Sequence, residues 1–126
     1  MFRPLVAALL ACGVACSTAL ADECEPSQDP SPATSEATGI DFYNDTQYAF
    51  RVLWAGEDGF LQEYGLFQPS EVARFDTYVG HRWFIELYAP EGAYCFGPVS
   101  APGPDACQAH ILFDGGIGID AGFCDF

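Results

Sequence analysis

The residues of this chain best suited to recognition chemistry are a hydroxyl, an imidazole and an indole that follow one another around a glycine. Thr77, His81 and Trp83 flank the tripeptide Tyr78-Val79-Gly80. Because three-residue hairpin loops commonly need glycine where φ is positive, we expect a tight hairpin here. Thr77 and His81 then lie opposite each other with Cβ atoms roughly 5 Å apart, and Trp83 lies further along the His81 face. The pattern predicts a cradle for a ring with a polar tip.

Aromatic residues at fixed spacing extend this pattern toward the N-terminus. Trp54 is followed by an Asp58-Gly59 turn, then by Gln62 and Tyr64, and the segment before it reads Phe42-Tyr43-Asn44-Asp45-Thr46. With Tyr78-x-Gly80-His81-x-Trp83, these positions match the spacing of one family without a gap from residue 42 to about residue 87. The segment resembles the β domain of the von Hippel-Lindau tumour suppressor, including its F-x-N-x-S and Y-x-G-H-x-W motifs.

The resemblance implies a pocket that grips an extended peptide containing 4-hydroxyproline. Trp83 matches the indole beneath the pyrrolidine ring in that family. Trp54 and Tyr78 match the aromatic walls, and Tyr64 matches the phenol that bonds the peptide backbone. Aromatic faces pack well against such a ring.

The polar residues of the pocket carry over with one exception. His81 matches the imidazole that reads the prolyl hydroxyl, and Thr77 stands where the family has serine and keeps the hydroxyl. Asp76 stands where the family has histidine, which puts a negative charge at the edge of the pocket and predicts a changed peptide preference. The sequence after Leu87 diverges and has no helical domain for a ubiquitin ligase scaffold, so a ligase role does not transfer.

Turn residues and alternating side chains predict that residues 39–126 form one all-β domain. Tyr48, Phe50, Val52 and Trp54 share one face of a stretch, as in a half-buried sandwich strand. No sustained helical period competes. We expect a single-domain antiparallel β-sandwich of about seven strands, stapled by disulfides. The predicted strands are 40–43, 46–54, 60–67, 71–78, 81–89, 93–98 and 107–113.

The N-terminus has the pattern of a secretory signal peptide. Arg3 precedes an apolar run that extends to Val14, and Ala19-Leu20-Ala21 forms a small-x-small cleavage site. We expect residues 1–21 to be removed after Ala21 and the mature protein to be secreted or periplasmic. Lipidation at Cys12 is the alternative, although the apolar segment before Cys12 is short.

Residues 22–38 are rich in proline, serine and acid, with no aromatic or aliphatic side chain larger than alanine. Such a segment buries too little surface to offset the entropy of ordering. The composition predicts a mobile leader.

Four cysteines remain after cleavage, namely Cys24, Cys95, Cys107 and Cys124, and in an oxidising compartment they predict two disulfides. Three pairings are open, and we favour Cys95 with Cys107 and Cys24 with Cys124. Two disulfides would help so small a core. No close Cys-x-x-Cys pair suggests zinc, and we expect neither a metal nor a cofactor.

The mature chain carries eighteen carboxylates against three arginines and no lysine, which makes its formal charge −15. So acidic a protein is a poor partner for nucleic acid or anionic membranes. No apolar stretch after the signal peptide is long enough to span a bilayer, so we expect no membrane insertion of the mature chain. The expected partner is an extended peptide or protein.

Two other functions stay open. In a structural or surface protein, Trp54 and Trp83 would be packing residues, deeply buried with no open cleft beside His81. An unrecognised hydrolase would need an acid-base pair, such as His81 with Asp76 or His110 with Asp114. Because no nucleophile motif accompanies either pair, we expect no enzyme.

Two short motifs have plain alternatives. The segment 115–120 matches the first six positions of a calcium-binding nonapeptide repeat, but a single copy favours a glycine-rich strand or turn. The sequon Asn44-Asp45-Thr46 would matter only in a eukaryotic secretory pathway and otherwise reads as a turn.

Overall fold

A computed structural model of the protein describes residues 23–126, so the predicted signal peptide lies outside the described residues. Within this range the chain is all-β, as predicted, and none of it forms a helix that could cross a membrane. The strands are β2 (Ala37–Asn44), β3 (Phe50–Ala55), β4 (Leu61–Phe67), β5 (Val72–Tyr78), β6 (Trp83–Ala89), β7 (Gly92–Val99), β8 (Cys107–Phe113) and β9 (Ile117–Asp120).

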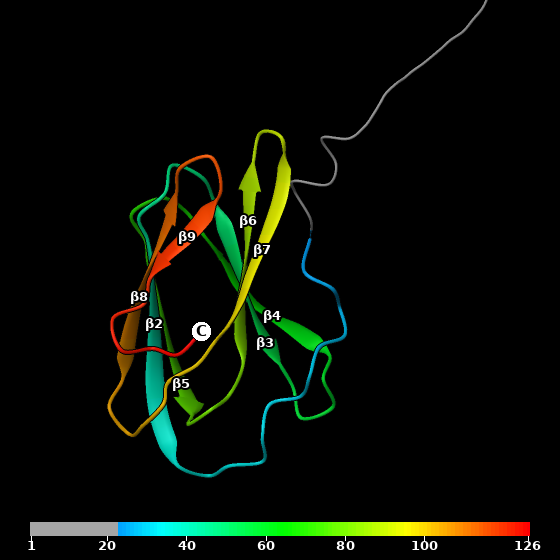
Figure 1. Ribbon diagram of the computed structural model, residues 1–126, viewed down its shortest axis with the longest axis vertical. Coiled ribbons are helices and arrows are strands. Elements are labelled where there is room, and N and C mark those ends of the chain that lie inside the picture. Colours follow the sequence, from blue (N-terminus) through cyan, green and yellow to red (C-terminus); the bar gives the residue numbers. More distant parts are fainter. Residues whose placement is uncertain (1–22) are drawn as a thin grey trace, which may run out of the picture.

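The strands form two four-stranded sheets packed on each other (Figure 1). The first sheet has the order β5-β2-β8-β9 and the second the order β4-β3-β6-β7. The predicted β-sandwich is confirmed, with two differences. The β2–β8 pair is parallel, and the glycine-rich segment at the C-terminus adds β9 as an edge strand.

Alternating side chains of both sheets fill the space between them. Phe42 on β2, Phe50 and Val52 on β3, and Ile85 and Leu87 on β6 are fully buried. Burial of each such side chain stabilises the fold by about 1.5–3 kcal/mol. This shared core fixes which face of each sheet points inward.

A smaller cluster lies on the outer face of the second sheet. Leu53, Ala55 and Phe84 are buried there, packed against Cys24 and Cys95. Since Leu53 alternates with the inward-facing Val52, it needs cover from outside the sandwich. Residues 24–36, which we call the N-terminal strap, run past the second sheet and beneath the sandwich to β2 (Figure 1, blue to cyan). Cys24, at the start of the strap, supplies part of that cover, together with Leu61 and Cys95.

Hydrogen bonds of its backbone hold the strap to the loop and strand that follow β3. Leu61 donates its N–H to the Pro26 carbonyl at 3.0 Å, and Gln28 donates to the Gly59 carbonyl at 2.7 Å. The Ser31 hydroxyl, buried, donates to the Ala55 carbonyl at 2.5 Å. A mobile leader was predicted here because the segment has few apolar side chains to bury. Composition gives no information about backbone hydrogen bonds, and these hold the strap in place.

The disulfides join Cys24 to Cys95 and Cys107 to Cys124. The favoured pairing of Cys95 with Cys107 and of Cys24 with Cys124 was therefore wrong. Cys95 on β7 packs on the outer face of the second sheet, whereas Cys107 on β8 lies in the core between the sheets. Nearness in sequence misled because the chain changes sheets between β7 and β8.

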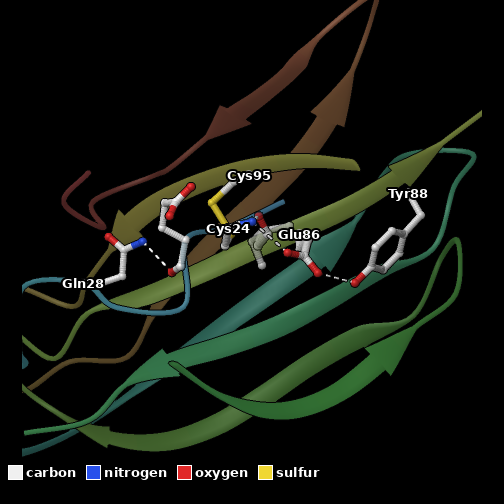
Figure 2. The surroundings of a disulfide bond; sticks show 7 residues. Cys24, Gln28, Glu86, Tyr88 and Cys95 are labelled. Carbon is white, nitrogen blue, oxygen red and sulfur yellow. Dashed lines mark hydrogen bonds between the residues drawn. A yellow bond between two sulfur atoms is a disulfide. The ribbon is translucent and has the colours of Figure 1, made fainter. Parts of the chain in front are cut away.

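Figure 2 shows a buried carboxylate beside the first disulfide. Glu86 accepts the backbone N–H of Cys24 at 2.8 Å and the hydroxyl hydrogen of Tyr88. Burial, together with the hydrogen bond to Glu86, raises the pKa of the Tyr88 hydroxyl above its ordinary value. The phenol therefore stays protonated and keeps donating to the carboxylate that holds the start of the strap.

Removing the Cys24–Cys95 disulfide should destabilise the fold. The bond closes a loop with a sequence separation of 71 residues, and such cross-links typically contribute about 2 to 4 kcal/mol. We expect Cys24→Ala with Cys95→Ala to lower the free energy of unfolding, measured with urea, by that amount. Ser35→Ala, at an exposed strap position, should change it by less than about 0.5 kcal/mol. Equal stability of the double variant and the wild type would contradict the role of the strap.

Asn44 ends β2 with a fully buried carboxamide. Its Nδ2 donates to the carbonyls of Tyr48 and Phe67 at 2.9 and 3.1 Å, and its Oδ1 accepts the Thr46 hydroxyl hydrogen at 2.7 Å. Asn44 is 1% exposed. A glycan on this nitrogen is incompatible with the fold, so the sequon serves as a turn.

Asn44→Ala should cost about 2 to 4 kcal/mol of unfolding free energy, because it leaves buried carbonyls and a hydroxyl without partners. Urea denaturation measures this loss. Gln47→Ala, at an exposed position in the same turn, provides the control and should change stability by less than about 0.5 kcal/mol. A loss of the same size in both variants would mean that the turn as a whole, and not the carboxamide network, carries the stability.

Candidate binding cleft

A cleft of about 260 Å³ opens beside the connection from β5 to β6. It lies between the two sheets, because β5 belongs to the first sheet and β6 to the second. All of the predicted ligand residues line it: Trp54, Tyr64, Thr77, Tyr78, His81 and Trp83. Asp76, the predicted modulator, lines it as well.

The connection itself differs from the predicted hairpin. The His81 N–H donates to the Tyr78 carbonyl at 3.0 Å, and Gly80 between them has φ of +80°. Glycine at this position of a tight turn was expected and is explained by the positive φ. However, β5 pairs with β2, and β6 pairs with β3 and β7, so the turn carries the chain across the sandwich. The prediction that Thr77 and His81 lie opposite each other in one sheet was therefore wrong. They line a cleft between the two sheets instead.

Trp83 and Thr77 join the two sheets beneath the cleft. The Trp83 indole is 3% exposed and belongs to the core, stacked on Phe75 with ring centroids 4.9 Å apart. Its Nε1–H donates to the Thr77 hydroxyl oxygen at 3.0 Å. Because this bond uses only one lone pair of the hydroxyl, the Thr77 O–H and a second lone pair remain for a ligand.

His81 is held by Trp54. The Trp54 Nε1–H donates to His81 Nδ1 at 3.1 Å, and the two rings are stacked at 5.7 Å. Since an indole N–H only donates, Nδ1 accepts, and the neutral imidazole must carry its proton on Nε2. Nε2 is buried without a partner among the described residues, and the side chain is 3% exposed. An unpaired buried donor of this kind is costly unless a ligand or water satisfies it.

Tyr64 and Tyr78 form the exposed part of the aromatic wall. They are 44% and 45% exposed. Tyr64 meets Trp83 edge to face at 5.4 Å, and Tyr78 lies 5.4 Å from the His81 ring. The cleft thus has a buried polar floor and an aromatic rim that is half open to solvent.

Three residues of this region were not predicted from the sequence. Phe75 supports Trp83 from below, and its position two residues before Thr77 on the same strand could have indicated a shared face. Glu57, in the turn after Trp54, and Thr34, in the strap, complete the lining. Nothing in the composition of the strap marked Thr34 as a site residue.

The residues considered for catalysis or metal binding do not assemble as proposed. His110 lies 2.6 Å from Asp45 and not with Asp114. His81 bonds Trp54, and no hydrogen bond joins it to Asp76. Within residues 23–126, no group of three or more histidine, cysteine or acidic side chains could hold a metal ion.

The bond from Trp54 fixes a measurable property of His81. In mildly alkaline buffer, long-range ¹H–¹⁵N spectra of labelled protein should show Nε2 of His81 protonated and Nδ1 unprotonated. Trp54→Phe removes the donor and should release this preference. His110, which is half-buried and lies outside the cleft, serves as the internal control and should not respond to that substitution. A protonated Nδ1 in the wild type would contradict the arrangement of the cleft.

Comparisons with known proteins assign no family to the chain. No family model matches it, and no curated protein matches it. A solved structure described as the NMR structure of the protein from Eubacterium rectale aligns with a TM-score of 0.49 and 19% identity, covering 75% of this chain and 98% of that chain. So weak a likeness carries no functional argument.

Proposed function

We propose that the protein binds an extended peptide, or an extended segment of another protein, by enclosing a hydroxylated ring in the cleft. The observation that carries the proposal is that six residues at the spacing of the von Hippel-Lindau pocket, drawn from both sheets, line one cleft. The resemblance implies that this ring is the side chain of 4-hydroxyproline. The ubiquitin ligase role of that family is not part of the proposal.

Hydrogen-bonding capacity supports a hydroxyl as the recognised group. Thr77 offers an O–H, and His81 offers an Nε2–H that has no partner among the described residues. A ligand oxygen satisfies such donors, and a hydroxyl can also donate to the second lone pair of Thr77. Trp54, which is partly buried, and the half-exposed Tyr64 and Tyr78 add aromatic surface against which a pyrrolidine ring packs.

The size of the cleft supports a single ring. At about 260 Å³ it lies just below the roughly 300–1,000 Å³ of sites that enclose drug-sized molecules. One residue of a peptide suits this volume, with the flanking residues lying outside it. We propose recognition without catalysis and without a cofactor.

We propose that the protein acts at the cell exterior or in the periplasm. Two disulfides fit an oxidising compartment, and the pattern of residues 1–21 predicts export. The partner would therefore be an extracellular or periplasmic protein with an exposed extended segment.

A structural or surface module is the second candidate, favoured by the burial of Trp83 in the core. That function predicts two deeply buried indoles and no opening beside His81. Trp54 is only partly buried, and the cleft next to His81 is open. Burial of Trp83 alone does not distinguish the candidates, because the floor of a binding site is also buried.

Calorimetry with two short alanine-based peptides, one with a central hydroxyproline and one with proline, tests the proposal. We expect the hydroxylated peptide to bind about tenfold more tightly, since partners for a buried hydroxyl contribute about 1 to 1.5 kcal/mol. His81→Ala should abolish this difference by weakening only the hydroxylated peptide.

His110→Ala provides the matched control, because His110 lies outside the cleft. It should leave both affinities unchanged. Equal affinity for both peptides, or no binding of either, rejects hydroxyproline recognition and leaves the structural module as the better account.

A further inference from the structure

Two carboxylates stand on the rim of the cleft, one from each sheet. Glu57 follows β3 of the second sheet, and Asp76 lies on β5 of the first. Both residues are exposed, and among the described residues neither side chain has a hydrogen bond or ion pair. The cleft is also lined by His81, whose buried Nε2 has no hydrogen-bond partner among the described residues.

Among residues 23–126, no arginine lines the cleft to neutralise this rim. Arg51 pairs with Glu63 at 3.3 Å, and Arg74 lies 3.6 Å from Asp41. Arg82, the remaining arginine of the described residues, does not line the cleft, and the whole sequence has no lysine. The field at the rim therefore attracts cations and repels anions.

Aromatic faces accompany the carboxylates. Tyr64 and Tyr78 are about half exposed on the same rim, and a cation held over an aromatic face gains additional attraction. Asp76 also borders a second hollow of about 320 Å³, which shares Thr77 and Tyr78 with the first and is lined in addition by Ala37 and Thr38. A peptide that leaves the cleft on this side passes the Asp76 carboxylate.

We propose that the ligand segment carries a lysine or arginine beside the residue that enters the cleft, and that Asp76 and Glu57 select it. The proposal rests on the proposed peptide binding and specifies its charge. An acidic segment is disfavoured at the same position by like-charge repulsion. Asp76, where the resembling family has histidine, is then a specificity residue. At this position the ligand preference of the protein differs from that of the family.

The test compares hydroxyproline peptides that differ at one flanking position, with lysine, norleucine or glutamate placed in turn before and after the hydroxyproline. Because the carboxylates are exposed, each pair contributes modestly, and we expect lysine to bind about three- to tenfold more tightly than norleucine. Glutamate should bind more weakly than norleucine. High ionic strength should shrink these differences by screening.

Asp76→Asn combined with Glu57→Gln should remove the preference for lysine, so that the lysine and norleucine peptides bind this variant equally. Asp114→Asn, in the turn between β8 and β9, removes a charge outside the cleft and should retain the preference. Equal binding of lysine and norleucine peptides overturns the proposal, as does an equal loss in the Asp114 variant.

The outcomes separate this inference from the function on which it rests. If no peptide binds, both fail. If hydroxyproline peptides bind without a charge preference, only the cation selection fails. A lysine preference that is the same for proline and hydroxyproline peptides upholds cation selection and rejects recognition of the hydroxyl.

Discussion

The hydrogen bond from the Trp83 indole to the Thr77 hydroxyl is the interaction on which the cleft depends. It joins the first residue of β6 to the end of β5, and these strands belong to different sheets. Core packing alone would leave the indole N–H buried without a partner, at a cost of about 1 to 3 kcal/mol. The same bond therefore closes the sandwich at this point and leaves a hydroxyl facing the cleft.

Local features of the sequence were sufficient to predict most of the strands and the positive φ of Gly80. Both follow from side-chain alternation and turn chemistry, which are properties of neighbouring residues. The partners of each strand were not predictable in the same way. The wrong hairpin of β5 with β6 and the wrong pair of Cys95 with Cys107 share one cause, because the chain passes from one sheet to the other between β5 and β6 and again between β7 and β8.

The sequence nevertheless predicted which residues line the cleft. The hairpin on which it placed Thr77 and His81 was wrong. Thr77, His81 and Trp83 stay close together whether the turn joins two strands of one sheet or strands of two sheets, because a short turn limits how far its flanking residues can separate. Glu57 and Thr34 escaped prediction for different reasons. Glu57 looked like an ordinary acidic turn residue, and Thr34 belongs to the strap, whose contacts are mainly to backbone groups.

The strap connects the disulfide to the cleft. From Cys24 it crosses the second sheet, where Ser31 accepts the Arg82 N–H next to His81. It then reaches the turn, where the Thr34 hydroxyl donates to the Val79 carbonyl at 2.8 Å. Thr34 thus comes to the cleft on a segment that has little apolar surface of its own and is held at its start by a covalent bond. Because the strap is fixed at both ends, the cleft is formed in the folded protein before any ligand arrives, which lowers the entropy cost of binding.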